Sequence, residues 1–463
     1  MSEAPPSAGP AAPRRALLLS TYDLGRQPFG LASPAAWLHE EGWAVACQDL
    51  AVESLDEQGA ATADLIAVHL PMHTATRLAS DLLPRLRAMN PSAHLCCYGL
   101  YAPLNEEHLR LKGAQTILGG EFEQGLLSLA RRLAAGSAAG PQREPTIDLG
   151  RQRFRVPRRQ HLPELSHYAK LEVAPGEQRL VGNTEASRGC KHRCRHCPVV
   201  PVYDGRFRIV DEQVVLEDVR NQVRSGARHI TFGDPDFFNA PTHALGLLET
   251  LHREFPDVTY DVTIKVEHLL AQHKLLPSLR RSGCILVTTA VESLDDEVLS
   301  RLDKGHTRAD FLQAVRLLRQ AGLAMNATFI PFTPWTSLAS YHDILATIRD
   351  QDLVDHVAPI QYGIRLLIMS SSRLLELDEI RAIVAPFDAQ QLVHPWSHPD
   401  TSMDVLCEDV LGIVHRSERH GLGRREIFRL VCQRAGLPGA ADLHGQQATP
   451  RIAVPFLTEP WYC

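Results

Sequence analysis

The stretch Ser187-Arg-Gly-Cys190-Lys-His-Arg-Cys194-Arg-His-Cys197-Pro198 decides how the rest of the chain is interpreted. It spaces three cysteines as C-x₃-C-x₂-C in a polar loop, directly after a predicted strand. Three thiolates at this spacing can face one centre from a single loop, and iron–sulfur clusters prefer thiolate ligands. Three ligands on a four-iron cluster leave one iron open, and chemistry at a metal requires an open position.

Zinc is the main alternative metal for this loop, because His192 or His196 could supply a fourth ligand. Structural zinc sites usually show paired C-x₂-C knuckles, which this stretch lacks. A haem attachment needs His directly after C-x-x-C, and Pro198 stands there. The spacing therefore favours a 4Fe–4S cluster on the three cysteines over zinc.

The bulk composition is that of an ordinary globular protein. The 463 residues are too many for one compact core, so two or three domains are expected. A net charge of −6 disfavours a nucleic-acid or acidic-membrane binder, and no stretch reaches the ~18 apolar residues of a membrane span. We expect a cytoplasmic protein, in which ten cysteines indicate metal binding or redox chemistry before disulfides.

The chain alternates short apolar runs with amphipathic segments, which predicts an α/β protein. Residues 1–14 are expected to be disordered, and residues 15–136 to form a doubly wound Rossmann-like domain. A Gly/Pro/Ser/Arg-rich linker over 137–178 follows. Residues 179–385 are predicted to form a partial (β/α)6 barrel, with its site at the C-terminal strand ends, and residues 386–463 a small helical region. The predicted barrel strands are 180–186, 229–232, 259–264, 285–291, 324–330 and 358–365.

The cysteine spacing after a first barrel strand resembles the signature of the radical S-adenosylmethionine (SAM) superfamily. The likeness covers residues 180–366, and the preceding domain resembles the cobalamin-binding-like domain that often accompanies such barrels. The resemblance implies an enzyme whose 4Fe–4S cluster cleaves SAM reductively, so that the radical modifies an unidentified small-molecule or peptide substrate. It also implies an external reductant such as flavodoxin or ferredoxin. No catalytic side chain acting on the substrate is assigned.

Two motifs match positions that bind SAM in the family. His196 stands where the family has a residue close to the adenine. The run Gly233-Asp234-Pro235-Asp236 replaces the usual Gly-Gly-Glu, so that Gly233 would allow close backbone approach and Asp234 or Asp236 would contact the methionyl ammonium. Pro235 departs from the pattern, and a simple Asp-Pro turn is the alternative for each acid.

The fourth and fifth strands carry further matches. The resemblance places Glu292 and Ser293 near the ribose and methionyl end of SAM, Arg301 near its carboxylate, and Ile330 on the apolar edge that faces the adenine. The residues themselves leave alternatives open. Ser293 could cap the following helix, Arg301 could pair with Glu297 at i, i+4, and Ile330 could be buried core.

The first domain leaves cobalamin open as a further cofactor. Related domains often carry Asp-x-His-x-x-Gly after the first strand, whereas residues 22–30 read Tyr-Asp-Leu-Gly-Arg-Gln-Pro-Phe-Gly. A His-ligated cobalamin is therefore not supported. Cobalamin without a protein ligand, near Pro71, Met72, Gly99 and 119–120, and a cofactor-free domain are both open. Bound cobalamin would favour methyl transfer as the activity.

The final residues, Glu459-Pro-Trp-Tyr-Cys463, resemble a radical SAM subfamily whose tail reads Cys-Sec-Ala-Glu-Pro or Cys-Cys-Ala-Glu-Pro. One expectation is that a selenocysteine follows Cys463, and the other is an ordinary C-terminal cysteine. A non-catalytic iron–sulfur or zinc protein is the rival class, with Cys284 or Cys407 as a fourth ligand. His268 and His306 are interpreted as solvated or capping side chains and receive no role.

Overall fold

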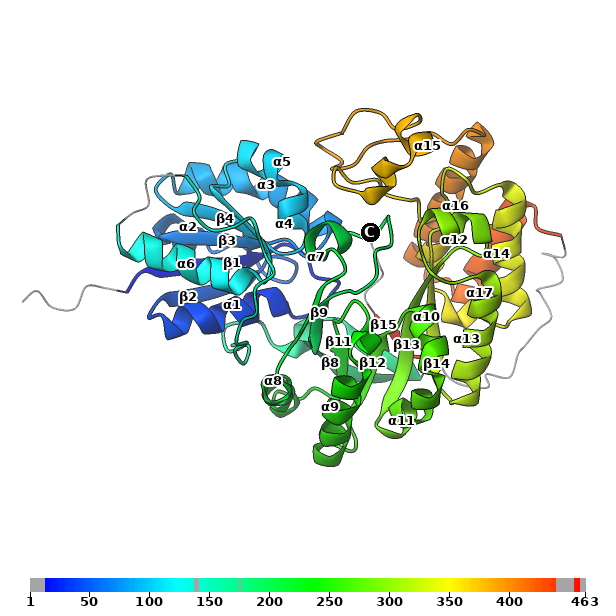
Figure 1. Cartoon of the computed structure of the whole chain (residues 1–463), viewed down its shortest axis with the longest axis horizontal. Coiled ribbons are helices and arrows are strands. Elements are labelled where there is room, and N and C mark those ends of the chain that lie inside the picture. Colours follow the sequence, from blue (N-terminus) through cyan, green and yellow to red (C-terminus); the bar gives the residue numbers. More distant parts are fainter. Residues whose placement is uncertain (1–12, 137–140, 175, 439–453, 459–463) are drawn as a thin grey trace, which may run out of the picture. The chain divides into compact units, whose positions relative to one another are not determined.

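The computed structural model describes residues 13–136, 141–174, 176–438 and 454–458 (Figure 1). The chain divides into two compact units. Unit 1 comprises Met1–Asp23 and Pro28–Pro163, and unit 2 comprises Leu24–Gln27 and Glu164–Cys463. Most of the segment predicted to be disordered, and the Cys463 tail with its selenocysteine hypothesis, lie outside the described residues.

Unit 1 is a parallel six-stranded sheet in the order β2-β1-β3-β4-β5-β6. Its central strands are buried along their length, because helices cover both faces, as in doubly wound folds. The predicted Rossmann-like architecture is confirmed. The strands are β1 (Arg15–Ser20), β2 (Ala44–Asp49), β3 (Leu65–His69), β4 (His94–Tyr98), β5 (Thr116–Gly120) and β6 (Ile147–Asp148). The helices are α1 (Phe29–Glu40), α2 (Glu57–Thr62), α3 (His73–Met89), α4 (Tyr101–Leu104), α5 (Glu106–Leu111) and α6 (Phe122–Ala134).

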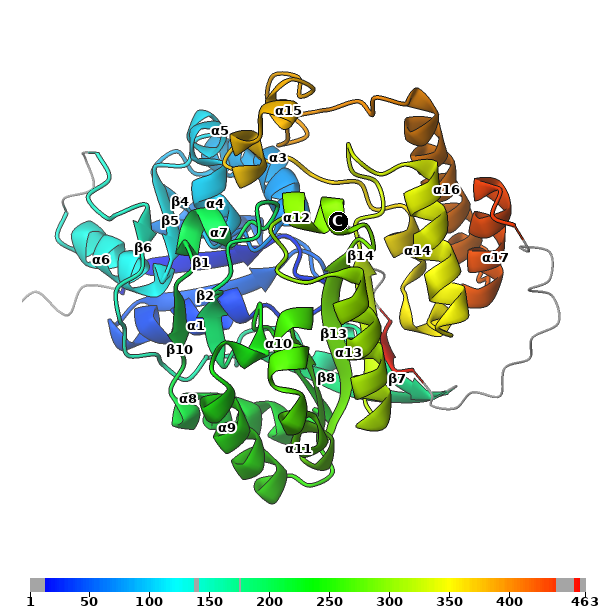
Figure 2. The same ribbon diagram turned by 45° about the vertical axis from the view of Figure 1, so that its right-hand side comes forward.

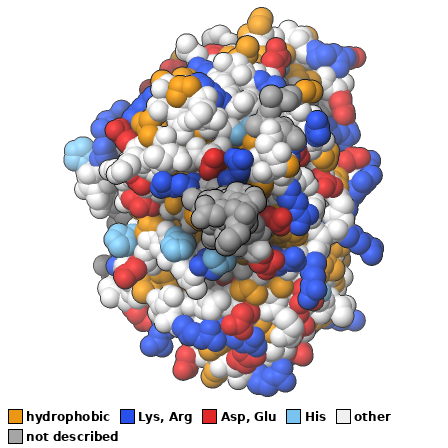
Figure 3. All heavy atoms as spheres, turned by 90° about the vertical axis from the view of Figure 1, so that its left-hand side faces the viewer, with side chains coloured by type: hydrophobic (Ala, Val, Ile, Leu, Met, Phe, Trp, Pro, Cys, Tyr) orange, Lys and Arg blue, Asp and Glu red, His pale blue; other side chains and the backbone are white. Residues whose placement is uncertain are grey.

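The predicted linker contributes strands to both units. Strand β6 pairs with β5 in unit 1, and β7 (Lys170–Ala174) pairs with β8 (Glu177–Thr184) in unit 2. Arg155, in the basic stretch 151–159, contacts α1: it pairs with Glu40 at 2.7 Å and lies 4.6 Å from the ring centre of Trp37. On the molecular face of Figure 3, basic and acidic side chains are interspersed.

Unit 2 is built on a seven-stranded sheet in the order β14-β13-β12-β11-β8-β7-β15 (Figure 2). Strand β8 and the next four barrel strands run parallel and lie in chain order, so their carboxyl ends meet at one edge. The added strands are β11 (His229–Phe232), β12 (Thr259–Thr263), β13 (Cys284–Glu292), β14 (Ala324–Phe329) and β15 (Phe456–Leu457). The connecting helices are α8 (Glu212–Arg224), α9 (Pro241–Glu254), α10 (Val266–Ala271), α11 (Leu276–Arg281), α12 (Asp296–Arg301), α13 (Arg308–Gln320) and α14 (Leu338–Asp350).

The prediction of a sixth barrel strand over residues 358–365 is wrong. Pro359 has no N–H to donate to a neighbouring strand, and the chain coils into the 3₁₀ helix η5 (Pro359–Tyr362). Only Arg365 returns to the sheet, through a single parallel bridge with Phe332. The barrel is therefore a five-stranded parallel arc with one isolated bridge at its end.

The C-terminal region is helical, as predicted, with α16 (Thr401–Arg419) and α17 (Arg424–Ala435) packed together. Strand β15 then pairs with β7 in antiparallel fashion, and β7 is antiparallel to β8. Strand β15 thus runs in the same direction as the barrel strands. Within the described ranges, no helix has the length and apolar character to cross a bilayer.

Candidate metal centre

The cysteine loop leaves the carboxyl end of β8 through a short antiparallel ribbon of β9 (Ser187–Gly189) and β10 (Phe207–Ile209). Gly189 has φ +74°, and a Cβ there would clash with the ring of Tyr203 and the carbonyl oxygen of Arg206. Only glycine satisfies both the left-handed backbone and the close packing. This glycine therefore sets the direction in which the chain enters the loop.

Neighbouring elements hold the backbone of the loop. Arg195 N donates to the Leu302 carbonyl at 2.9 Å, and Arg373 Nη1 donates to the Arg193 carbonyl at 2.8 Å. The Asn239 side chain accepts from Lys191 N and donates to the Gly189 carbonyl, both at 3.3 Å. The loop conformation is thus fixed by protein contacts.

Cys194 is buried, and Cys190 and Cys197 are partly buried. Burial, with a smaller contribution from the neighbouring thiols, raises the pKa of the Cys190 thiol to about 11 and that of Cys197 to about 12. Three soft thiolate donors on one preorganised loop suit an iron–sulfur cluster, and metal binding must displace their protons.

The histidines of the loop do not complete a zinc site with the cysteines. His196 Nε2 lies 3.1 Å from Glu292 Oε1, and His192 Nε2 lies 3.3 Å from His268 Nε2. Sulfurs on one tetrahedral zinc ion would be about 3.8 Å apart. Among the described residues, the cysteine trio is not a group whose ligand atoms all lie within 4.8 Å of one another. The donor set fits a larger cluster.

Neither rival fourth cysteine lies in the loop's surroundings. Cys284 is the first residue of β13, at the sheet edge opposite the loop. Cys407 in α16 donates its Sγ to the Gly363 carbonyl at 3.5 Å. Both thiols are buried in packing roles.

Glu292 ends β13 with φ +66°, a backbone conformation that costs a non-glycine residue about 1–3 kcal/mol. Its Oε1 accepts from Lys304 Nζ at 3.1 Å and lies 3.1 Å from His196 Nε2. Burial alone would raise the pKa of Glu292, but Lys304 and His196 outweigh it and hold that pKa well below its usual range. The strained backbone thus aims an ionised carboxylate at the cysteine loop.

Lys304 was missed by sequence reasoning. Its ammonium is buried, with 3% of the residue exposed, and it interacts electrostatically with Cys194 and Cys197. A signal was available, because only six of the 48 basic residues are Lys. Two of those six, Lys265 and Lys304, are buried in this region.

The two aspartates after β11 both have protein partners. Asp234 accepts from Ala186 N at 2.9 Å and from the Ser187 hydroxyl at 2.6 Å. Asp236 Oδ1 caps the 3₁₀ helix η2 (Phe237–Asn239), and its Oδ2 faces His268. Gly233 is different, because a Cβ there would meet no atom closer than 3.6 Å. The protein's own packing does not demand glycine at this position.

The remaining predicted residues have separate settings. Ser293 accepts from Asp295 N at 3.1 Å, but the N-cap of α12 is Asp295 and not Ser293. Arg301 pairs with Glu297 at 3.1 Å, the i, i+4 alternative. Ile330 donates its N–H to the Glu292 carbonyl at 2.8 Å and packs against buried side chains of unit 2.

The glycines proposed as a cobalamin cradle in unit 1 are enclosed by the chain itself. A Cβ on Gly119 would clash with Pro103, and one on Gly120 would clash with the Asp148 carbonyl of β6. Protein atoms therefore explain why both positions are glycine.

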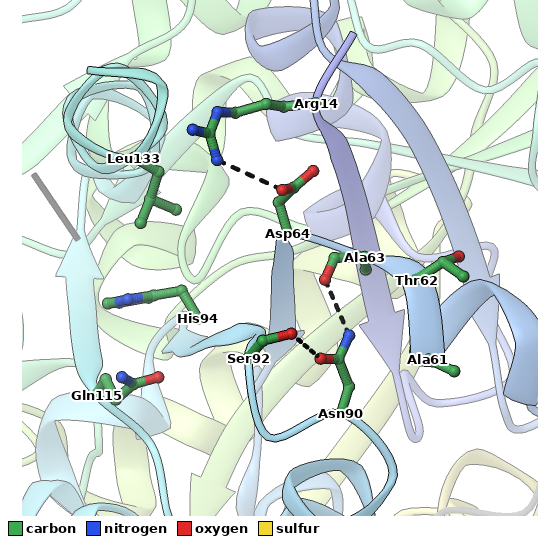
Figure 4. A pocket seen from close by; sticks show the side chains of 10 residues that line it. All are labelled: Arg14, Ala61, Thr62, Ala63, Asp64, Asn90, Ser92, His94, Gln115 and Leu133. Atoms are coloured by element: carbon green, nitrogen blue, oxygen red, sulfur yellow. Dashed lines mark hydrogen bonds and ion pairs between the residues drawn. The ribbon is translucent and has the colours of Figure 1, made fainter. Parts of the chain in front are cut away.

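A pocket in unit 1 is lined by residues at the amino ends of its strands (Figure 4). Ligands of doubly wound sheets bind at the opposite edge. The polar side chains of the pocket have protein partners, as in Arg14–Asp64 at 3.4 Å, Ser92–Asn90 at 2.8 Å and His94–Thr116 at 2.8 Å. We assign it no ligand.

Comparisons with known proteins agree with the geometry. Residues 184–345 match the model of the radical SAM superfamily. Bacteriochlorophyllide d C-12(1)-methyltransferase of Chlorobaculum tepidum is 29% identical over 133 residues, 28% of each chain. A tRNA-2-methylthio-N(6)-dimethylallyladenosine synthase of Chlorobium phaeobacteroides is 27% identical over 187 residues, 38% of this chain and 42% of that protein. The chain thus spans less than half the length of these two curated relatives.

A longer match is the hopanoid C-3 methylase of Methylococcus capsulatus, 23% identical over 340 residues, 69% of this chain and 64% of that one. Among solved structures, the cobalamin-dependent SAM radical enzyme OxsB has a TM-score of 0.71 at 14% identity, covering 91% of this chain and 71% of OxsB. The radical SAM methyltransferase TsrM from Kitasatospora setae has a TM-score of 0.64 at 18% identity, covering 81% and 80%. These likenesses show the two-unit fold, and residues 184–345 of this chain are a radical SAM domain.

Proposed function

We propose that this protein is a radical SAM enzyme, which holds a 4Fe–4S cluster on Cys190, Cys194 and Cys197 and cleaves SAM reductively to modify a small-molecule substrate. The observation that carries the proposal is a protein-held loop of three thiols at the carboxyl edge of a radical SAM domain. The cluster, when bound, supplies the electron that breaks a carbon–sulfur bond of SAM. A protein reductant must deliver that electron, and a reducing cytoplasm suits such thiols.

The chain's own residues would hold the cluster and orient SAM beside it. Lys304 places a buried positive charge beside Cys194 and Cys197, which offsets the charge of the thiolates in a loaded site. Its pairing with Glu292 keeps that carboxylate ionised and directed at His196, the residue proposed to lie near the adenine. The Lys304–Glu292 contact is buried, so water does not compete for it, and the His196–Glu292 contact is partly buried.

SAM would be bound along the carboxyl edge of the sheet. Gly233 leaves room for close approach at the end of β11, and Glu292, Ser293 and Ile330 would line the ends of β13 and β14. The structure favours an indirect role for the aspartates: Asp234 holds the exit from β8, and Asp236 orients His268. Contact of Arg301 with the SAM carboxylate stays a prediction that competes with its Glu297 pair.

The test is anoxic reconstitution with iron and sulfide. The wild-type protein should bind about four irons and four sulfides per chain, its reduced EPR signal should change on adding SAM, and dithionite should yield 5′-deoxyadenosine. Cys194→Ala should lose the cluster, whereas Cys407→Ala, outside the loop, should keep it. Anoxically purified protein that lacks inorganic sulfide and carries zinc that is lost in Cys194→Ala would refute the proposal.

Methyl transfer with cobalamin is a second candidate. Several relatives are methyltransferases by name, and OxsB and TsrM share the two-unit fold. Titration of the reconstituted protein with hydroxocobalamin decides: stoichiometric retention through gel filtration supports this candidate, and release of all corrin absorbance removes it.

A further inference from the structure

A second group of potential metal ligands lies beside the cysteine loop. His192 comes from the loop itself, Asp236 follows β11, and His268 lies in α10 after β12. One donor atom from each lies within 4.8 Å of the others, and no other His/Cys/Asp/Glu trio in the described part of the chain meets that condition. The expectation that His268 is a solvated or capping side chain is wrong, because only 5% of the residue is exposed.

The two imidazole rings face one another through their Nε2 atoms, 3.3 Å apart. Each ring has a carboxylate at its other nitrogen. Asp236 Oδ2 lies 2.6 Å from His268 Nδ1, and Glu267 Oε2 lies 3.5 Å from His192 Nδ1. For His192, a carboxylate at Nδ1 is the usual setting of a metal-binding histidine, because it directs the Nε2 lone pair towards the ion.

The 3.3 Å separation of the two Nε2 atoms is at the long end of a hydrogen bond and also matches two nitrogen ligands of one cation. An N–H···N hydrogen bond is normally about 2.9–3.0 Å long. Two nitrogens at about 2.05 Å from one ion, with a tetrahedral angle between them, are about 3.3 Å apart.

Two buried polar atoms without hydrogen-bond partners also lie in this group of ligands. Asp236 Oδ2 and His268 Nδ1 are both buried and neither makes a hydrogen bond of acceptable geometry, although the two atoms are close. Asp236 has only 1% of its surface exposed, and its Oδ2 is also 3.7 Å from His192 Nε2. An unsatisfied buried carboxylate oxygen costs several kcal/mol in order of magnitude, and a bound cation would remove that cost.

We propose that His192, Asp236 and His268 bind one divalent cation at a site separate from the cysteines. Two imidazole nitrogens and one carboxylate oxygen suit a borderline ion such as Zn²⁺ or Fe²⁺, with water at the remaining positions. Because His192 lies between Cys190 and Cys194, the ion ties the cysteine loop to the ends of β11 and β12. The site concerns this second ion and does not depend on cleavage of SAM.

The experiment measures zinc in the cluster-loaded protein. Wild type, Asp236→Asn, His268→Gln and the control His415→Gln, an exposed histidine of α16, are reconstituted anoxically and freed of loose metal. Iron, sulfide and zinc are then counted while Zn²⁺ is titrated against a chromophoric chelator. We expect one zinc per chain in addition to the cluster in wild type and His415→Gln, and an affinity at least about 100-fold lower in the two ligand variants.

The iron and sulfide counts separate this inference from the proposed function. A full cluster with no extra zinc in wild type, or with equal zinc affinity in Asp236→Asn, would overturn the second site and leave the cluster intact. If a ligand variant loses its cluster, Co²⁺ is added to the wild-type protein instead, and its absorption spectrum shows which residues bind the second ion. Weak visible bands without thiolate charge transfer support the triad, and intense near-ultraviolet thiolate charge transfer refutes it.

Discussion

Lys304 Nζ donates a hydrogen bond to Glu292 Oε1 across 3.1 Å, and both side chains are buried next to the cysteine loop. Removing one partner of a buried ion pair leaves an uncompensated charge, at a cost of about 3–5 kcal/mol. Lys304→Met should lower the free energy of unfolding of unit 2 by about that amount in urea titrations. Lys274→Met, on an exposed lysine, should stay within about 0.5 kcal/mol. The double variant Lys304→Met/Glu292→Gln should recover part of the loss, and no recovery would count against the pair.

A substitution at Gly189 tests whether its backbone conformation positions the cysteine loop. Gly189→Ala meets both a positive φ and a steric clash, so we expect the cluster content to fall well below that of the wild type. Gly421→Ala is the matched control, because its φ is +70° and no atom lies within 4 Å of its Cβ. That change should cost only about 1 kcal/mol of strain and leave the cluster content unchanged. Equal iron and sulfide in both variants would show that the Gly189 backbone does not position the cysteines.

Gly233 separates ligand binding from folding. Gly233→Ala has room for its methyl group, so the free energy of unfolding should change by less than about 0.5 kcal/mol. If SAM approaches the backbone there, the dissociation constant of SAM should rise at least about 10-fold, because one displaced contact is worth about 1.4 kcal/mol. Equilibrium dialysis of the reconstituted protein checks this, with Gly246→Ala in α9 as the control. Unchanged affinity would remove Gly233 from the proposed binding site.

The lowered pKa of His94 should make the stability of unit 1 depend on pH. Burial lowers the pKa of His94 to about 4, with Arg132 and Arg87 adding to the fall and Glu144 opposing it. The unfolded chain takes up this proton near pH 6.5 and the folded one near pH 4, so unit 1 loses stability as the pH falls through this window. The loss is about 3 kcal/mol. His94→Gln can keep a hydrogen bond to the Thr116 hydroxyl, 2.8 Å from His94 Nε2, while removing the titration. Its urea midpoint should therefore depend less on pH between 4 and 6.5, and parallel curves for both proteins would contradict the assignment.

Local sequence patterns were sufficient for most strands. Residues 229–232 form a strand with the predicted limits, because a short run that is buried on both faces leaves few alternatives. Residues 358–365 have an equally apolar pattern, but Pro359 made the helical turn more favourable. The residues of the site were harder to predict. Lys304 and His268 reach it from helices and loops after different strands, and their burial depends on how those connections fold back, which periodicity does not encode.

The late position of strand β15 in the sequence affects how the sheet forms during synthesis. The edge of β7 is covered by residues 288 positions later in the chain, through Thr458 Oγ1 and Lys170 N. A nascent chain can assemble β8 to β14 while the outer side of β7 still has unpaired backbone groups. Until the last segment leaves the ribosome, that edge is open to pairing with another copy. Chains released early by a stalled or terminated ribosome would therefore be expected to aggregate through β7, even with every barrel strand present.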